Sequence, residues 1–254
     1  MTSSKGTVLV TGAARRIGKA IALDLAARGY RIAIHANSSG QEAEAVADFI
    51  RDAGGVAEVF LADLSDGKAT RALHNEVTGK LGAPDIIVNN ASVFEDDNVR
   101  DFDEDKFDRN FAIHVKAPAI LAEAMAANLT DERDGLIINI IDQRVWKLTP
   151  RFFSYTLSKA ALWTATQTMA QALAPRIRVN AIGPGPTLAN ERQKDEEFAK
   201  QTEAVPLQRG PELAEFGATI RYLHEARSVT GQMIALDGGQ HLAWETPDVV
   251  GIGE

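Results

Sequence analysis

The sequence predicts a doubly wound α/β fold, in which a parallel β-sheet carries helices on both faces. Short segments that are apolar throughout alternate with longer amphipathic segments along the chain, as in proteins whose parallel strands are buried between helices. Right-handed crossovers between such strands place helices on both faces of the sheet. The sequence contains no internal repeat, low-complexity tract or Pro/Ser-rich linker, so we expect a single domain over residues 1–254.

The expected elements alternate in order from the N-terminus. The apolar run at 7–10 predicts a strand, and the apolar periodicity of 17–28 predicts a helix that ends at Gly29, because glycine favours helix C-termini. A second strand and helix follow at 30–35 and 41–53 by the same criteria. The remaining strands are expected at 59–61, 86–88, 135–141, 177–181 and 232–236, and the remaining helices at 70–81, 107–128, 155–173 and 212–223.

The composition excludes several classes of function. A formal net charge of −8 argues against a nucleic-acid partner, because phosphate binding requires a basic face. No apolar run approaches the roughly 20 residues of a transmembrane helix, and the N-terminal segment lacks the apolar core of a signal peptide. The absence of Cys excludes disulfides and thiolate catalysis. We therefore expect a cytoplasmic protein with a small-molecule substrate, no membrane partner and no metal site.

The turn after the first strand is a candidate phosphate-binding loop. Gly12 and Gly18 flank this turn, which exposes backbone N–H groups and a helix N-terminus, and both attract a pyrophosphate. Arg15 and Arg16 stand beside each other in the loop, and a nearby anion would explain two guanidinium groups that otherwise repel. A solvated basic loop is the alternative. The predicted cofactor contacts here are Gly12, Arg15, Arg16, Ile17 and Gly18.

The end of the second strand predicts which nicotinamide cofactor binds. Sites selective for NAD usually carry Asp or Glu at this point, to bind the ribose 2′-hydroxyl. This chain has His35, Asn37, Ser38 and Ser39 there instead, and small polar groups beside Arg15 suit a 2′-phosphate. We therefore predict NADP(H) as the cofactor, with an ordinary polar loop as the alternative.

Two further strand ends supply candidate cofactor contacts. Asp63 and Leu64 follow the third strand, and Asn90, Ala91 and Ser92 follow the fourth. Small polar residues after a buried strand allow a ligand to lie close to the backbone. Each segment could equally be only a turn.

Tyr155 and Lys159 form the candidate catalytic pair. Their (i, i+4) spacing places both side chains on one face of the expected helix at 155–173. A Tyr hydroxyl has a pKa of about 10, and a neighbouring ammonium group is expected to lower that pKa and so favour proton transfer. The pair follows a buried strand that leads directly to Asp142, which strengthens the interpretation.

The ordered motifs resemble the short-chain dehydrogenase/reductase family over nearly the whole chain. This resemblance implies a Rossmann-type domain with a seven-stranded parallel sheet, hydride transfer between nicotinamide and a carbonyl, alcohol or imine carbon, and a homotetramer, or alternatively a homodimer. The matching motifs are Thr11-Gly12 with Ile17-Gly18, Asn89-Asn90-Ala91, Tyr155 with Ser158-Lys159, Arg178-Val179-Asn180, Pro184-Gly185 and Asp237-Gly238-Gly239.

Four departures from the common family pattern resemble the pteridine reductase branch. Asp142 stands in place of the usual Ser and Arg16 in place of a glycine, and Ser92 and Phe94 also depart from the common sequence. The resemblance implies that Arg16 reaches cofactor and pterin, that Phe94 stacks on the pterin, and that Ser92 lines the pocket. It also implies that Asp142 acts with Tyr155 in protonating the ring.

The four departures also have a physical rationale. A flat ring stacks on an aromatic face, and a carboxyl group protonates a ring nitrogen better than a Ser hydroxyl. Asp142 could instead be a loop carboxylate or a helix cap, and Phe94 could be core packing. Large side chains at 143–154 could line a pocket or form an interface.

The resemblance assigns further residues around the substrate. Pro184, Gly185 and Thr187 are expected to surround the nicotinamide carboxamide, and the charged segment 188–205 is expected to form a lid. That segment could equally be a solvated helix face. His114 occupies a position where the family normally has Asn. It could keep a proton path and titrate near neutrality, or it could be a buried structural imidazole.

Three functional hypotheses follow. The first is an NADP(H)-dependent reductase of a carbonyl or imine substrate, such as a pterin-like compound. The second is a 3-oxoacyl-thioester or carbonyl reductase. The third, from a different class, is a non-catalytic NADP(H)-binding sensor. Sensors of this kind often lose the Tyr-Lys pair, and this chain retains Tyr155 and Lys159.

Overall fold

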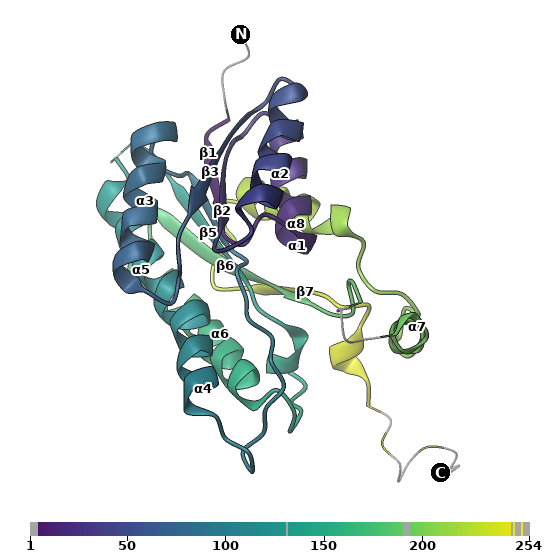
Figure 1. Ribbon diagram of the computed structural model, residues 1–254. Helices are drawn as coiled ribbons and strands as arrows, with labels where there is room; N and C mark the ends of the chain where they lie inside the picture. The colour runs from purple at the N-terminus through teal and green to yellow at the C-terminus, as the bar shows by residue number, and fades with distance from the viewer. Residues whose placement is uncertain (1–4, 131, 190–193, 245, 247–249, 251–254) are drawn as a thin grey trace.

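Seven parallel strands form one sheet in the order β3-β2-β1-β4-β5-β6-β7, as Figure 1 shows. The structure is a computed structural model that describes residues 5–130, 132–189, 194–244, 246 and 250. All neighbouring strands pair in parallel, which confirms the predicted doubly wound α/β sheet. The strands are β1 (Thr7–Val10), β2 (Arg31–Ala36), β3 (Val56–Leu61), β4 (Ile86–Asn89), β5 (Gly135–Ile140), β6 (Ile177–Pro184) and β7 (Met233–Leu236).

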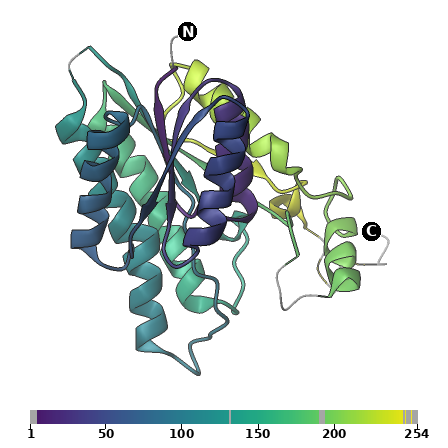
Figure 2. The same ribbon diagram turned by 45° about the horizontal axis from the view of Figure 1, so that its top comes forward.

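The two faces of the sheet carry separate hydrophobic cores, because successive strand side chains point to opposite faces. Val8 and Val10 of β1 belong to one core, and Leu9 belongs to the other. Figures 1 and 2 show the helices divided between these faces. One face is covered by α1 (Arg16–Ala27), α2 (Gly40–Asp52) and α8 (Leu213–Glu225), and the other by α3 (Gly67–Leu81), α5 (Ala117–Asn128) and α6 (Phe153–Leu173).

The helix expected at 107–128 is longer and less regular than predicted. It comprises α4 (Glu104–Phe111), a π-helical turn, η1 (Ala112–Lys116), and α5, and Figure 2 shows α4 and α5 running on from one another. Pro118 stands at the start of α5, and a proline inside a helix removes one N–H donor and crowds the carbonyl four residues earlier. A widened turn accommodates this, and such turns are frequent at functional sites.

Other boundaries also differ from the predicted ones. β6 continues to Pro184, three residues beyond the expected end at 181, and so reaches the carboxyl edge of the sheet. The expected lid at 188–205 contains a helix, α7 (Asp195–Glu203), which Figure 1 places away from the sheet. Residues 190–193 of that segment lie outside the described residues. Among the described residues, no helix combines the length and apolar character needed to cross a bilayer.

Candidate active site

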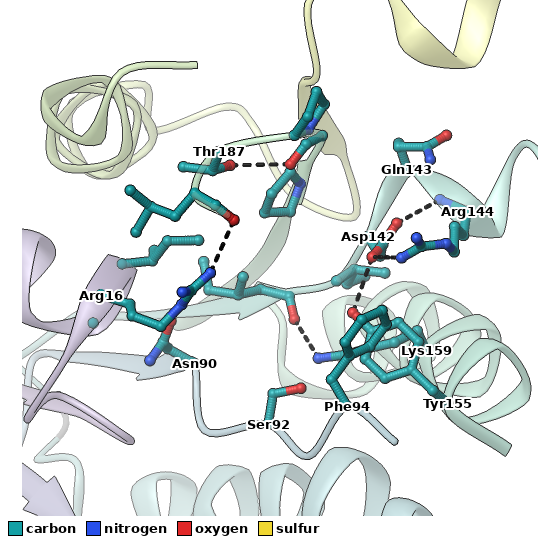
Figure 3. Close-up of a pocket in the computed structure, with 18 of the residues that line it drawn as sticks. Arg16, Asn90, Ser92, Phe94, Asp142, Gln143, Arg144, Tyr155, Lys159 and Thr187 are labelled. Atoms are coloured by element: carbon teal, nitrogen blue, oxygen red, sulfur yellow. Dashed lines mark hydrogen bonds and ion pairs between the residues drawn. The ribbon is translucent and has the colours of Figure 1, made fainter. Parts of the chain in front are cut away.

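A pocket of about 760 Å³ opens at the carboxyl ends of β1, β4, β5 and β6, where ligands bind in sheets of this kind. Figure 3 shows the side chains that surround it. The predicted residues that line it are Gly12, Arg15, Arg16, Ile17, Gly18, Asn90, Ala91, Ser92, Phe94, Asp142, Tyr155, Lys159, Pro184, Gly185 and Thr187. The structure therefore brings together residues that lie more than 170 positions apart in the chain.

Several lining residues had not been singled out from the sequence as site residues. Gln143 and Arg144 follow Asp142 directly, and their position beside a candidate catalytic residue was the available signal. Phe198 and Gln201 of α7 lie three residues apart, so one helix face presents both to the pocket. The full set of such residues is Ile140, Ile141, Gln143, Arg144, Pro186, Leu188, Phe198, Gln201 and Gln240.

The turn after β1 requires its two glycines. Gly12 has φ +63°, a conformation that glycine adopts without the steric cost of a side chain. At Gly18, a Cβ atom would lie 2.3 Å from the Gly12 carbonyl oxygen and 2.5 Å from Asn90 Nδ2. The turn and the first turn of α1 therefore pack closely, and the N–H groups at the start of α1 remain available to a ligand.

His35 joins the turn after β1 to the segment after β3 by two hydrogen bonds. It is 2% exposed, and its Nδ1 accepts a hydrogen bond from the Gly12 N–H at 3.1 Å. Because a backbone N–H can only donate, Nδ1 is unprotonated, and the proton on Nε2 is donated to the Ala62 carbonyl at 3.0 Å. Burial lowers the pKa of His35. Both ring nitrogens of His35 therefore bind protein backbone groups, and the side chain is not free to contact a ligand.

The other cofactor residues predicted after β2 and β3 also lie apart from the pocket wall. Asn37, Ser38 and Asp63 are exposed, and Asp63 accepts hydrogen bonds from the backbone and hydroxyl of Ser65. The predicted cofactor residues that do not line this pocket are His35, Asn37, Ser38, Ser39, Asp63 and Leu64. Apart from His35, their contact with a cofactor stays a prediction.

The two arginines of the turn have different partners. Arg15 forms an ion pair with Glu42 of α2, so its anion in this structure is a carboxylate of the protein itself. Arg16 donates from its guanidinium to the carbonyls of Ala189 at 2.8 Å and Leu188 at 3.1 Å. Arg16 also has φ +52°, the left-handed region in which a non-glycine residue is strained. This explains why related turns carry glycine here, and it shows that the Arg16 side chain spans from the turn to the expected lid.

Asp142, Tyr155 and Lys159 lie together on the opposite side of the pocket. The Tyr155 hydroxyl donates to Asp142 Oδ2 at 3.0 Å, and Lys159 Nζ donates to the carbonyl of Ile140 at 2.8 Å. Burial lowers the pKa of Lys159 to about 8, although the charge of Asp142 opposes this shift. The Lys159 ammonium lies 5.6 Å from the centre of the Tyr155 ring. The three predicted catalytic groups are therefore gathered as expected.

The pKa of Tyr155 shifts in the direction opposite to the one expected. Burial raises it well above the ordinary value of 10.0, the negative charge of Asp142 raises it further, and the charge of Arg144 partly opposes both. The sequence argument considered only the neighbouring ammonium group. It could not include the desolvation of a fully buried phenol or the carboxylate that accepts its hydrogen bond. In the free protein, Tyr155 is a neutral hydrogen-bond donor.

Phe94 takes part in an aromatic cluster at the pocket wall. Its ring stacks on Phe152, with centroids 4.2 Å apart and planes 10° from parallel, and it meets the Tyr155 ring edge-on at 4.8 Å. Phe152 has φ +56° just before α6. Phe94 therefore lines the pocket and also packs against protein, and its stacking on a substrate ring stays a prediction.

His114 is a buried neutral imidazole. It is 1% exposed. Its Nε2 accepts from the Val93 N–H at 3.1 Å, so the proton lies on Nδ1, which is 2.8 Å from Ser158 Oγ. The Ser92 hydroxyl lies 3.0 Å from the same Nε2. Burial and then the charge of Lys159 lower the pKa of His114 well below 6.5. Titration near neutrality, one of the two expectations, is contradicted.

Asp97 fixes the start of the helix that carries the catalytic pair, a role that sequence reasoning missed. It is 6% exposed, and its carboxylate accepts from the Ser154 N–H at 3.1 and 3.2 Å and from the Ser154 hydroxyl. The Phe153 N–H donates to the Asp97 carbonyl. A negative charge at a helix N-terminus is stabilising, but Asp97 lies 57 residues before Ser154. No local pattern could have linked them.

Comparison with known proteins identifies relatives of the whole chain. The sequence model of the family described as enoyl-(acyl carrier protein) reductase matches residues 12–241. The 3-oxoacyl-[acyl-carrier-protein] reductase FabG of Staphylococcus epidermidis is 30% identical over 241 residues, which are 93% of this chain and 99% of that protein.

Two solved structures extend the comparison. FolM alternative dihydrofolate reductase 1 from Brucella canis, complexed with NADP, is 60% identical, with a TM-score of 0.95 over 97% of this chain and 98% of that one. A blue fluorescent protein from a metagenomic library, in complex with NADPH, is 30% identical, with a TM-score of 0.85 over 93% of this chain and 98% of that one.

Proposed function

The chain belongs to the short-chain dehydrogenase/reductase family, and from that premise we propose that it reduces a pterin-like ring. It is an NADP(H)-dependent oxidoreductase that transfers a hydride to a carbonyl or imine carbon. The observation that carries the proposal is the hydrogen bond of 3.0 Å from the Tyr155 hydroxyl to Asp142, beside the Phe94 ring at the pocket wall.

The pocket fits a dinucleotide on one side and a flat substrate on the other. The close packing at Gly18 lets a phosphate approach the N–H groups at the start of α1. We assign Gly12, Arg16, Ile17 and Gly18 to the phosphates and Asn90, Ala91, Pro184, Gly185 and Thr187 to the nicotinamide end. When bound, the reduced nicotinamide supplies the hydride. Lys159 is placed to hold its ribose, because its ammonium group lies at the pocket wall behind Tyr155.

Tyr155 and Asp142 together hold the proton that goes to the substrate. Tyr155 carries it as a neutral phenol, and Asp142 accepts its hydrogen bond. As negative charge develops on the substrate, Tyr155 donates its proton, and the Lys159 ammonium stabilises the phenolate that remains. His114 acts as a positioning residue in this scheme, because it is neutral and joins the Val93 backbone to α6 through Ser158.

A pterin-like substrate is supported by the nature of the pocket wall. An aromatic ring at Phe94 offers a stacking surface, and Arg16 and Ser92 line the same pocket. The Asp142 carboxylate accepts a hydrogen bond from the Tyr155 hydroxyl and so orients the group that would protonate a ring nitrogen. The FolM proteins of Brucella, at 60% identity, are described as alternative dihydrofolate reductases, which supports the same class of substrate.

A 3-oxoacyl-thioester reductase is the second candidate function. The FabG proteins of Staphylococcus, at 30% identity over 93% of this chain, favour it. An acyl thioester would contact the aromatic side chains only by packing. It has no ring nitrogen, so the pairing of Asp142 with Tyr155 would have no ring to protonate.

A substrate panel separates the candidates. NADPH oxidation is followed with dihydrobiopterin, dihydrofolate and acetoacetyl thioesters, each repeated with NADH. We expect kcat/KM to be highest with a pterin and to favour NADPH. Higher kcat/KM with the thioester would assign the second function, and a preference for NADH would reject the cofactor. Binding of NADPH without turnover of any compound would instead favour the sensor.

The domain organisation, the lid, the oligomeric state and the location of the protein are also proposed. We propose that residues 1–254 form one dinucleotide-binding domain, that the segment 188–205 covers the substrate, and that the enzyme is a cytoplasmic homotetramer. Phe198 and Gln201 of α7 at the pocket wall support the covering role. Light scattering measures the oligomer directly, with a homodimer as the alternative.

A further inference from the structure

We propose that Arg144 is a positioning residue that holds the Asp142 carboxylate in place and offsets the second negative charge formed when Tyr155 gives up its proton. The inference deepens the proposed function and rests on its assignment of Tyr155 as the proton donor. Arg144 lies two residues after Asp142, in the short 3₁₀ turn η2 (Gln143–Val145) that follows β5. It lines the pocket, and Figure 3 shows its side chain beside Asp142.

Arg144 contacts both oxygens of the Asp142 carboxylate. Its backbone N–H donates to Oδ1 at 2.8 Å, and its guanidinium Nη1 donates to Oδ2 at 3.0 Å. The Tyr155 hydroxyl donates to the same Oδ2. The Asp142 carboxylate thus accepts three hydrogen bonds, and the one from the guanidinium group is strengthened by its positive charge. The same contacts fix the oxygen that orients the Tyr155 hydroxyl.

After proton transfer, the charges around this pair balance only when Arg144 is present. Before proton transfer, the site holds one anion, Asp142, near the cations Arg144 and Lys159. After transfer it holds two anions, because Tyr155 has become a phenolate. His114, which faces the Tyr155 ring from the π-helical turn at 5.5 Å, is neutral and contributes no charge. Without Arg144, Lys159 alone would face two anions that lie within hydrogen-bond distance.

The aromatic cluster holds Arg144 from its other side. The guanidinium carbon lies 5.3 Å from the Phe94 ring centre and 5.4 Å from the Phe152 ring centre, distances at which cation–π attraction operates. The Arg144 side chain is 23% exposed. The guanidinium group is thus fixed between the acid and the rings, and this arrangement uses a planar group that a Lys would reproduce only in charge.

The test compares Arg144→Gln, Arg144→Lys and Arg151→Gln. Arg151 is the matched control, because it also lies 5.3 Å from the Phe152 ring but pairs with the exposed Asp96. The kcat and KM of each variant are measured with whichever compound the wild type reduces. For Arg144→Gln we expect kcat to fall by about tenfold or more, because the second negative charge is no longer offset. Arg144→Lys, which keeps the positive charge, should recover part of this loss, and Arg151→Gln should leave kcat unchanged.

A second readout needs no substrate. In protein labelled with ¹³C-Asp, the carboxyl signal that Asp142→Asn removes should change its chemical shift in Arg144→Gln and keep it in Arg151→Gln. NADPH affinity and Tm report folding of each variant. An unchanged kcat and an unchanged Asp142 signal in folded Arg144→Gln would overturn the inference. If the wild type reduces carbonyls but no pterin, the proposed substrate class is wrong. The Arg144 variants can then still be compared with a carbonyl substrate, so the proposed role of Arg144 is tested separately.

Discussion

The two sides of the pocket are built in different ways. On the chemical side, defined as Asp142, Tyr155 and Lys159, the phenol and the amine are buried and the three groups are tied to one another or to strand β5. On the turn side, defined as Arg15 and Arg16, both side chains are exposed, and they bond to Glu42 and to the expected lid. Burial shifts the pKa values of Tyr155 and Lys159.

The difference indicates a division of labour. Removing one partner of a buried hydrogen bond leaves the other partner buried and unpaired, which costs about 1–3 kcal/mol of stability. An exposed ion pair contributes only about 0–1 kcal/mol to stability. The chemical side is therefore preorganised before any ligand arrives. The contacts of the turn side can be exchanged at low cost, so Arg15 and Arg16 can release their protein partners for an anionic ligand. Variants at four positions test this contrast, from the largest expected effect to the smallest.

Tyr155→Phe should have the largest effect. It removes the hydroxyl that donates to Asp142 but preserves the ring that packs against Phe94. We expect kcat to fall by about 10² or more, because the general acid is lost, while NADPH affinity stays close to that of the wild type. Steady-state kinetics and a fluorescence titration measure the two quantities. Turnover equal to that of the wild type would remove Tyr155 from the mechanism.

Lys159→Met should alter stability in a pH-dependent way. Lys159 has a pKa of about 8 when folded, against an ordinary value of 10.5, so the unfolded state binds more protons between these values and stability rises with pH in that window. Relative to Lys159→Met, the wild type should gain about 3 kcal/mol from pH 8 to pH 10.5, because one pH unit corresponds to about 1.4 kcal/mol.

Urea unfolding of both proteins at a series of pH values measures this difference. The control is Lys68→Met, which replaces an exposed lysine and should show no such trend. If the difference in free energy of unfolding between wild type and Lys159→Met does not change with pH, burial does not lower the pKa of Lys159 in the folded protein.

Arg16→Gly and Arg16→Ala separate backbone strain from side-chain function. Both remove the donors to Leu188 and Ala189, so we expect both to weaken NADPH binding several-fold. Glycine relieves the strain of φ +52° and alanine keeps it, so Arg16→Gly should be more stable than Arg16→Ala by about 1 kcal/mol. Thermal unfolding measures the order, and equal stabilities would contradict a strained Arg16.

Glu42→Gln should have the smallest effect. It removes the charge that pairs with Arg15 on the surface, which changes stability by less than about 1 kcal/mol. Arg15 then becomes available to a ligand phosphate, so NADPH affinity should rise slightly, and the gain should shrink at high salt because exposed charges are screened. Asp48→Gln, which leaves Arg15 untouched and removes an exposed carboxylate paired with Arg51, is the control. Weaker NADPH binding in Glu42→Gln would contradict the exchange of partners.

Much of the fold followed from local patterns. The strand at 7–10 has the predicted bounds, because a run that is apolar throughout is buried on both faces. The helices at 17–28 and 41–53 begin one residue earlier than expected. The helix at 107–128 was less well predicted, because its π-helical turn depends on how Pro118 is accommodated.

The site was predictable where one helix or one turn carries it. The spacing of Tyr155 and Lys159 and the position of Asp142 at a strand end were enough to bring these groups together. The partners of His35 and Arg15 were not predictable, because they lie 23 and 27 residues away in the sequence. These contacts depend on which elements become neighbours after folding.

The sequence alone determined the parallel sheet, the helices around it and the residue types at the carboxyl ends of the strands, because these depend on periodicity and short-range spacing. The tertiary structure decided which of those residues are buried and what each one contacts. It made Tyr155 and His114 neutral and gave Lys159 a pKa of about 8. Protonation depends on desolvation and on charges brought close by folding, and neither can be read along the chain.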